Sequence, residues 1–324
     1  MVGDALGFYS FWRWAKHRLR PDAQRKCGML LIYGLGLLVM AGHLAGASDS
    51  SGFASIVTTP TALANGSPFL LTVKLAQKAS IVRGVWFGKD VSFFKGPNGP
   101  SGELWYALAG VDVETVPGSY PLTLQAVTLD GHDLHAGTQL AVAEAKYHSG
   151  ELTVGGNFVE PDAATQKEIA LDKQIKDRVF SQTASAPLWA GDFVRPVKEP
   201  STDSFGTRRT FNGKLASIHR GMDFRAPAGM PVASANAGTV VLAQKLFYEG
   251  NCVVIDHGLG LMTIYMHFSR LEVAPGERVR KGQRLGLSGA TGRVTGPHLH
   301  FAVRWHEAYL DPAGLFRLRL TGKP

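Results

Sequence analysis

Two short motifs in the chain contain side chains that could bind a metal ion. In the first, His219 and Asp223 are four positions apart, and about eighty residues later His298 and His300 flank Leu299. Imidazole nitrogens and carboxylate oxygens are protein ligands of zinc. Residues i and i+2, or i and i+4, of a strand point to the same face, so the two segments could direct their ligands at one point. Together the motifs predict a metal-dependent hydrolase, whereas either motif alone is equally compatible with a solvated strand edge.

A further histidine, His267, lies at the end of a strand predicted over residues 263–269 and could join the same site. Catalytic zinc commonly has three protein ligands and one open position for water. The metal lowers the pKa of that water and polarises a substrate carbonyl, and a nearby histidine can transfer protons or stabilise the oxyanion. Spacing alone therefore leaves open which of these groups are ligands and which are catalytic.

The region around these residues is predicted to be a β domain, over residues 205–316. Apolar and β-branched runs occupy residues 239–243, 252–256 and 261–265, and Gly258 and Gly260 predict a turn between the last two. The region contains no long helical pattern, which disfavours a parallel α/β fold.

The preceding region is also predicted to be β-rich, so the expected fold class is mainly β. Strand patterns at residues 69–73, 104–111 and 120–127 are separated by turn signals. Strands at this spacing predict a sandwich of immunoglobulin-like type over residues 52–155. Residues 156–204 are expected to form a polar connecting helix, near residues 160–185, and a proline-containing linker.

Residues 1–47 have the order of a secretory signal. A basic region precedes an uncharged apolar run at residues 28–41, and Ala45, Gly46 and Ala47 offer a cleavage site. The run is short for a membrane span, but extending it over residues 27–47 reaches about 20 residues, so a cleaved signal peptide and an uncleaved signal anchor both stay open. In both cases the rest of the chain is expected to be exported to the cell envelope, periplasmic or extracellular.

Cysteine usage agrees with export. Cys27 begins the apolar run, so the exported part has one thiol, Cys252, and no internal disulfide. Cys252 lies in a strand pattern and is expected to be a small core residue, because a catalytic thiol needs an accessible, electropositive setting.

Charge is unevenly distributed along the chain. The formal net charge is +4 over residues 1–47, −4 over residues 48–189 and +8 over residues 190–324. A basic domain commonly meets an anionic partner. The sequence has no aromatic–basic stripe or nucleic-acid motif, so no nucleic acid partner is predicted, and an anionic cell wall and plain solubility stay as alternatives. The opposite charges also raise the hypothesis that the acidic segment covers the site in the basic domain.

The two metal-binding motifs belong to a longer series of characteristic segments. These segments are residues 205–206, 219–224, 229–232, 238–241, 250–251, 255–258, 265–267, 289–292, 295–301 and 311–312. Through them, residues 205–312, about a third of the chain, closely resemble the lysostaphin-type, or LytM-like, zinc metallopeptidases of family M23.

The resemblance implies a division of labour at the site. It implies that His219, Asp223 and His300 bind Zn2+ and that His267 and His298 flank the metal as catalytic histidines. It also implies an antiparallel β-sandwich with a groove, and peptide cross-links or stems of bacterial peptidoglycan as substrates. The family commonly has Leu at the position of Phe268, a difference that adjoins the site.

The predicted function is therefore a zinc-dependent endopeptidase that hydrolyses peptide bonds in peptidoglycan. The alternative is a non-catalytic, wall-binding regulator of another hydrolase, but such relatives typically lose zinc ligands and this chain keeps them. A lipoyl-type carrier domain would need Lys281 at a tight hairpin tip, and that context is absent. His257 is expected to be structural, while Arg220 and Arg225 either meet substrate carboxylates or are solvated.

Overall fold

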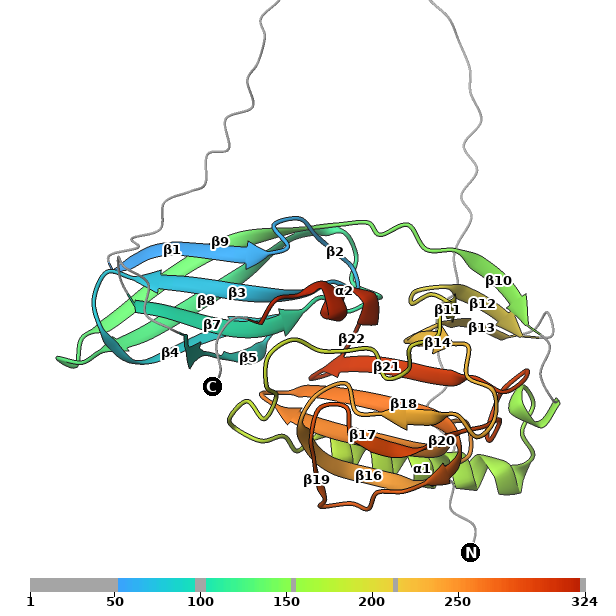
Figure 1. Cartoon of the computed structure of the whole chain (residues 1–324). Helices are drawn as coiled ribbons and strands as arrows, with labels where there is room; N and C mark the ends of the chain where they lie inside the picture. The colour runs from blue at the N-terminus through green and yellow to red at the C-terminus, as the bar shows by residue number, and fades with distance from the viewer. Residues whose placement is uncertain (1–51, 97–102, 153–155, 212–214, 321–324) are drawn as a thin grey trace, which may run out of the picture. The chain divides into compact units, whose positions relative to one another are not determined.

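The computed structural model describes residues 52–96, 103–152, 156–211 and 215–320 (Figure 1). Most regular structure in these ranges is β, and the α-helices in them are α1 (Ala163–Phe180) and α2 (Pro312–Arg317). The predicted mainly β fold class is confirmed. The predicted signal segment, residues 1–47, lies outside the described residues. None of the helices in the described ranges combines the length and the apolar character of a membrane span.

The N-terminal part of the described chain, up to the end of β9, forms two sheets. One has the strand order β1-β3-β7-β6 and the other the order β2-β9-β8-β4-β5. Their bounds are β1 Phe53–Thr59, β2 Leu63–Ala64, β3 Pro68–Leu75, β4 Ala79–Trp86, β5 Lys89–Ser92, β6 Phe94–Lys95, β7 Glu103–Gly110, β8 Gly118–Thr128 and β9 Asp133–Ala143. Side chains of β8 alternate between buried and exposed, which places Leu122, Leu124 and Ala126 on its inner face. Two sheets fit the predicted sandwich, and its immunoglobulin-like type and boundaries stay a prediction.

A three-stranded sheet and a helix connect these sheets to the C-terminal region. The three strands are β10 (Ser149–Leu152), β12 (Arg208–Phe211) and β13 (Leu215–Ile218), and a short 3-10 helix, η1 (Gly156–Phe158), precedes α1. The carboxylate of Asp162 accepts from the backbone N–H of Thr165 at 2.8 Å and caps α1. Ile175, Val179 and Phe180 of α1 pack against a buried apolar cluster of the large sheet. The expected connecting helix is thus present and also covers part of that sheet.

The C-terminal region forms one ten-stranded sheet in which all paired strands are antiparallel. Its strands are β11 Ser201–Asp203, β14 Met222–Phe224, β15 Pro231–Ala233, β16 Gly238–Leu246, β17 Gly250–Gly258, β18 Leu261–Leu271, β19 Arg278–Val279, β20 Arg284–Ser288, β21 Leu299–Trp305 and β22 Ala308–Leu310. The long strand β18 pairs with β17 and β21, and its last residues pair with β20. The runs predicted at residues 239–243, 252–256 and 261–265 lie in β16, β17 and β18.

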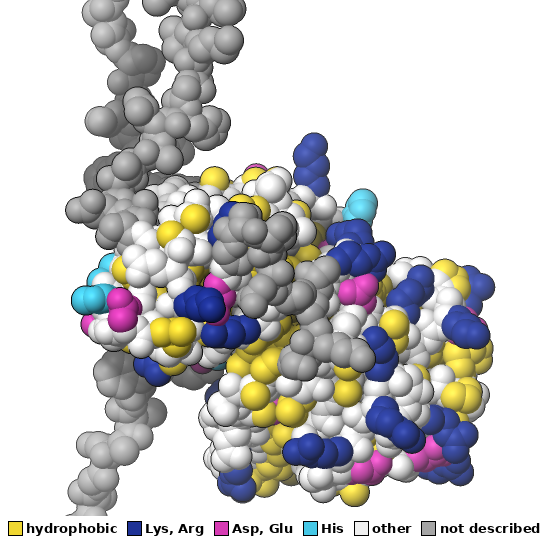
Figure 2. All heavy atoms as spheres, turned by 60° about the vertical axis from the view of Figure 1, so that its left-hand side comes forward, with side chains coloured by type: hydrophobic (Ala, Val, Ile, Leu, Met, Phe, Trp, Pro, Cys, Tyr) yellow, Lys and Arg dark blue, Asp and Glu magenta, His cyan; other side chains and the backbone are white. Residues whose placement is uncertain are grey.

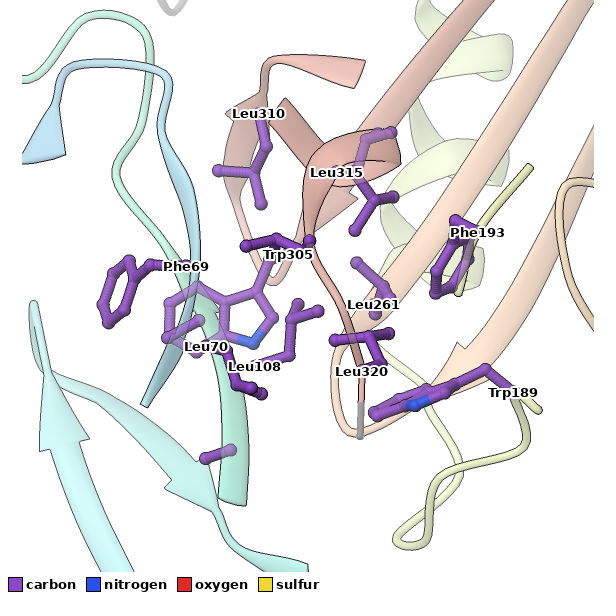
Figure 3. Packing of buried hydrophobic residues seen from close by; sticks show 14 of the residues in the cluster. Phe69, Leu70, Leu108, Trp189, Phe193, Leu261, Trp305, Leu310, Leu315 and Leu320 are labelled. Atoms are coloured by element: carbon purple, nitrogen blue, oxygen red, sulfur yellow. The ribbon is translucent and has the colours of Figure 1, made fainter. Parts of the chain in front are cut away.

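One continuous apolar core joins the N-terminal sheets to the large sheet. Figure 3 shows Leu70 and Leu108 facing Trp305 and Leu310 in this core. A Cβ added at Gly110 would lie 2.3 Å from Leu310 Cδ2, so the close approach depends on the missing side chain. The contact between the N-terminal sheets and the large sheet therefore includes an apolar core.

Basic side chains are dispersed over the described residues of the face drawn in Figure 2, with acidic side chains between them. A nucleic-acid-binding surface usually gathers its Lys and Arg side chains on one face or stripe. The expectation that nucleic acid is not a partner stays a prediction.

Candidate metal centre and active site

Strand pairing brings the two sequence motifs together. Asp223 in β14 is directly opposite His300 in β21, and His300 is opposite Met266 of β18 on its other side. His219 follows the end of β13, and the chain bends at Gly221 before β14 begins. Residues about eighty positions apart in the sequence thus become cross-strand neighbours. The side chains of such neighbours are close enough to interact directly.

The three predicted metal ligands converge on one point. Asp223 Oδ1 lies 3.0 Å from His219 Nε2 and 2.8 Å from His300 Nδ1, and the two imidazole nitrogens are 3.0 Å apart. Ligand atoms of a tetrahedral ion with bonds of about 2.0 Å are about 3.3 Å apart. The donor set and its spacing therefore fit a divalent metal ion, and these three residues form the metal-compatible group found among the described residues.

The orientation of His219 is fixed by the backbone. Its Nδ1 lies 2.9 Å from the carbonyl oxygen of Ser204, which can only accept, so Nδ1 carries the proton and Nε2 presents its lone pair to the centre. The side chain of His219 is almost fully buried, at 2% exposure. A hydrogen bond from the far ring nitrogen is the usual way in which proteins orient a metal-binding histidine.

Gly221, between the two ligands of the first motif, makes room for the second motif. A Cβ at this position would lie 2.4 Å from His300 Nε2 and 2.7 Å from the carbonyl oxygen of Phe301. Both distances are shorter than van der Waals contact, so a larger residue would displace His300.

His267 and His298 line the same cavity beside the three candidate ligands. Their ring centroids are 4.9 Å apart, and the ring of His267 is 6.1 Å from that of His300. Nδ1 of His267 donates to the carbonyl of Thr291 and Nδ1 of His298 to that of Gly296, both at 2.8 Å. The Nε2 atom of each ring is therefore available for proton exchange. Nε2 of His298 lies 3.8 Å from Oδ1 of Asp223.

The backbone of β18 is irregular at His267. Tyr265 is opposite Val253 and Phe268 is opposite Asn251, so β18 has one extra residue here, a β-bulge. His267 has a φ of 69°, in the left-handed region that side chains other than glycine rarely adopt, at a cost of about 1–3 kcal/mol. The prediction that His267 ends a strand is therefore wrong, because β18 continues to Leu271 and the bulge, not a strand end, redirects the side chain.

Burial and neighbouring groups shift the ionisation of the centre. Burial lowers the pKa of His267 to about 3, and charge on His300 and His298 lowers it further. Burial also lowers the pKa of His300, although its hydrogen bond to Asp223 opposes this. Burial alone would raise the pKa of Asp223, but the imidazoles of His219 and His300 beside its carboxylate outweigh this effect and hold the pKa well below its ordinary value. Asp223 is thus ionised and His300 neutral, the forms in which they bind a cation.

The five predicted site residues line a cavity of about 950 Å³. Its wall is rich in arginine, and the arginines that line it are Arg208, Arg209, Arg220, Arg225 and Arg293. Of the lining residues, Glu114 comes from the loop between β7 and β8, and it accepts a hydrogen bond from Arg220. The other lining residues lie between residues 202 and 309. Among the described residues of the acidic segment, Glu114 alone lines the cavity, so the hypothesis that this segment covers the site depends on the Glu114 carboxylate.

The sequence prediction missed two residues that contact the candidate ligands. Arg209 donates to Asp223 Oδ2 at 2.7 Å, and Asp203 pairs with Arg209 and lies 3.6 Å from His219 Nδ1. The only signal in the sequence is the basic pair Arg208 and Arg209 shortly before His219. Asp203 could not be found in this way, because its position depends on the pairing of β11 with β14.

Three other residues occupy positions that agree with their expected minor roles. His257 is buried within β17 and bonds through both ring nitrogens to Ala237 and Thr263, in agreement with a structural role. Cys252 is buried, and burial raises its pKa well above the ordinary value. Lys281 donates to the backbone carbonyls of Ala190 and Asp192, at 2.7 and 3.1 Å, so its amine is engaged rather than presented at a hairpin tip.

The region that contains the site is similar in sequence to known peptidases. Residues 217–312 match Peptidase family M23. The peptidoglycan DD-endopeptidase ShyA of Vibrio cholerae is 51% identical over 179 residues, which are 53% of this chain and 41% of that protein. An uncharacterized metalloprotease of Haemophilus influenzae is 31% identical over 188 residues, 55% of this chain and 39% of that protein. The chain thus spans about two fifths of the length of these two relatives.

A solved structure extends the similarity beyond the matched family region. The putative peptidase M23 of Pseudomonas aeruginosa is 27% identical, with a TM-score of 0.59, and the comparison covers 78% of this chain and 94% of that one. This coverage is larger than the ten-stranded sheet alone, so the N-terminal sheets are part of the shared fold.

Proposed function

We propose that residues 217–312, which match Peptidase family M23, form a peptidase domain, and that the chain is a zinc-dependent endopeptidase that hydrolyses peptide bonds in bacterial peptidoglycan. One observation carries the proposal: His219, Asp223 and His300 converge in a cavity that His267 and His298 also line. Three candidate ligands, with two further imidazoles beside them that are available for proton transfer, have the composition of a hydrolytic metal site.

The ligand atoms for zinc would be Nε2 of His219, Oδ1 of Asp223 and Nδ1 of His300. When bound, the zinc supplies a Lewis acid that polarises the scissile carbonyl and lowers the pKa of a water molecule to about 7. His267 and His298 transfer protons through Nε2, accepting one from the attacking water and delivering one to the leaving amine. The hydrogen bonds from Nδ1 to backbone carbonyls keep the proton on Nδ1, so Nε2 has the lone pair that accepts a proton.

Apart from Arg209, which pairs with Asp203 and Asp223, the arginines of the cavity wall support a substrate with carboxylates, because guanidinium groups bind carboxylates in pairs of hydrogen bonds. Peptidoglycan stems are peptides with free carboxylates, and the V. cholerae relative ShyA is a peptidoglycan DD-endopeptidase. The basic and apolar order of residues 1–47 supports export to the cell envelope, where this substrate lies.

The test is to incubate the purified full chain with defined peptidoglycans and to identify soluble fragments by mass spectrometry. We expect about one zinc per chain and fragments that identify one type of cleaved peptide bond. The matched control is His267→Ala, which keeps all three ligands. A chain that binds zinc but releases no fragment from any peptidoglycan type would contradict the proposal and favour the non-catalytic regulator.

A further inference from the structure

The two carboxylate oxygens of Asp223 have different partners. Oδ1 faces the imidazoles of His219 and His300, whereas Oδ2 accepts a hydrogen bond from Nη2 of Arg209 at 2.7 Å. The side chains of Asp223 and Arg209 expose only 11% and 13% of their surface. A buried carboxylate–guanidinium contact is stronger and more directional than a neutral hydrogen bond, so it fixes the plane of the Asp223 carboxylate.

Arg209 is in turn held by Asp203. Both Nη2 and Nε of Arg209 donate to Asp203 Oδ2, the latter at 3.1 Å. Asp203 is itself fixed, because its Oδ1 accepts from the hydroxyl of Thr207 at 2.9 Å and from the backbone N–H of Ser204 at 2.7 Å. The pairing of β11 with β14 places Asp203 opposite Asp223 in register, and Arg209 reaches both from β12.

The charges of this group explain why two residues are needed. A guanidinium beside a metal ligand orients that ligand but also repels a divalent cation. Asp203 offsets the charge of Arg209, and it lies 3.6 Å from Nδ1 of His219, the other ring nitrogen of a second ligand. The pair therefore contacts two of the three candidate ligands without adding net charge to the site.

We propose that Arg209, anchored by Asp203, is a positioning residue that presents Asp223 to the metal through Oδ1 alone and thereby raises the metal affinity of the site. This inference rests on the proposed function only for the identity of the metal. It adds to that function a pair of residues that touch the ligands rather than the substrate.

The test measures zinc affinity of the full chain by competition with a chromophoric chelator. Loss of a group that orients a metal ligand typically weakens binding by about 10–100-fold. We expect a loss of this size for Arg209→Gln, and a smaller one for Arg209→Lys, which keeps the charge but lacks the planar fork. For Asp203→Asn, which leaves the charge of Arg209 uncompensated, we expect about 10-fold. The matched control is Arg225→Gln, an exposed arginine of the same cavity, which should leave zinc affinity unchanged.

Thermal unfolding in excess chelator separates positioning from folding. We expect Asp203→Asn to keep a cooperative transition and to lose part of the rise in Tm that zinc gives the wild type, so it answers the question even if Arg209→Gln does not fold. Wild-type zinc affinity in Arg209→Gln or Asp203→Asn overturns the inference, and so does a raised KM with unchanged zinc affinity, which would make Arg209 a substrate contact. These results leave the proposed function intact, whereas a wild-type chain that binds zinc but cleaves nothing defeats only the proposed function.

Discussion

The N-terminal sheets and the ten-stranded sheet differ in what they bury. Among the described residues, the buried polar side chains of strands β1–β9 are Thr58 and Thr128. From residue 201 on, the buried polar side chains include three histidines, two aspartates and Asn236. Buried polar groups cost free energy unless they are paired, so a region that concentrates them is maintained for more than packing.

Part of this polar core supports the strand that carries His267. The ring of His257 bonds to the hydroxyl of Thr263 at 2.8 Å, and that hydroxyl bonds to the phenol of Tyr265 at 3.0 Å. Tyr265 accepts in turn from the backbone N–H of Ala235 at 2.8 Å. The chain of hydrogen bonds ends two residues before the bulge in β18, so it stiffens the strand where the backbone of His267 is strained. The N-terminal sheets, by contrast, contribute apolar contacts.

The largest expected effect of a single change is in the metal centre. His300→Ala removes one of three ligands and leaves Asp223 and His219 close together without a cation to share. Zinc content should fall from about one per chain to near zero, and peptidoglycan cleavage should be lost with it. Zinc content can be measured by atomic emission after dialysis. Retention of full zinc occupancy would show that the ligand set was assigned incorrectly.

A smaller loss is expected when a proton-transfer group is removed from the same sheet. His267→Ala should lower the cleavage rate by about 10²–10⁴-fold, the usual contribution of a general acid or base. Zinc content should stay at the wild-type value, because His267 is outside the ligand set. Stability in the absence of zinc should fall by about 1–3 kcal/mol, because the carbonyl of Thr291 loses its hydrogen-bond donor and alanine keeps the strained φ of 69°. A rate within about threefold of the wild type would exclude a role in proton transfer.

Much of the site was predictable because its residues lie in short motifs whose spacing places them on one face of a strand. The alternation of a strand places His298 and His300 on one side of Leu299, which is fully buried. The register that brings Asp223 opposite His300 is a tertiary fact, and it was expected only through the resemblance to a family. The bulge at His267 could not be predicted, since one extra residue in β18 becomes visible only against its partner β17.

The predictable part of the fold was likewise the local part. The runs at residues 69–73 and 120–127 lie in β3 and β8, and the run at residues 104–111 lies in β7 except for its last residue, because apolar and β-branched periodicity is a local property. Gly110 and Leu310 are in contact although they are two hundred positions apart in the sequence. No local sequence pattern indicates this contact. Asp203 and Arg209 were missed for the same reason, since surface-type charged residues are recognised as functional only when their partners are known.

Equal apolar truncations in the two regions would sharpen the comparison. Leu122 in β8 and Leu299 in β21 are both buried, at 1% and 0% exposure, so Leu→Ala at either should lower the unfolding free energy by about 2–5 kcal/mol. Leu299→Ala should in addition weaken zinc binding, because Leu299 holds the strand between His298 and His300. Leu122→Ala should leave zinc affinity unchanged. Chemical denaturation and chelator competition measure the two quantities, and equal zinc affinities in both variants would contradict the difference between the regions.

Acid should destabilise the chain through the ten-stranded sheet. Burial lowers the pKa of His257 to about 4, against about 6.5 in an unfolded chain, so below pH 6.5 the unfolded state binds a proton that the folded state does not. The unfolding free energy should therefore fall as pH drops from about 6.5 to 4, with a contribution of up to about 1.4 kcal/mol per pH unit. His257→Gln, which keeps a donor and an acceptor, should remove this contribution when unfolding is followed in excess chelator. The control is His132→Gln, an exposed side chain of the N-terminal sheets, and an equal change of slope in the control would refute the assignment.

The smallest effect is expected where the two regions meet through charge. Arg220 and Glu114 form an ion pair with side chains about half exposed, so Glu114→Gln should change the unfolding free energy by less than about 1 kcal/mol. The cleavage rate should change by no more than about fivefold, the factor that corresponds to this energy. The change is small because, among the described residues, Glu114 is the one residue of the N-terminal region that lines the cavity. The matched control is Lys89→Gln, which breaks the exposed pair with Glu307 away from the cavity. If Glu114→Gln raised activity tenfold or more while the control did not, a single carboxylate would close the site, and the N-terminal sheets would regulate the enzyme rather than only pack against it.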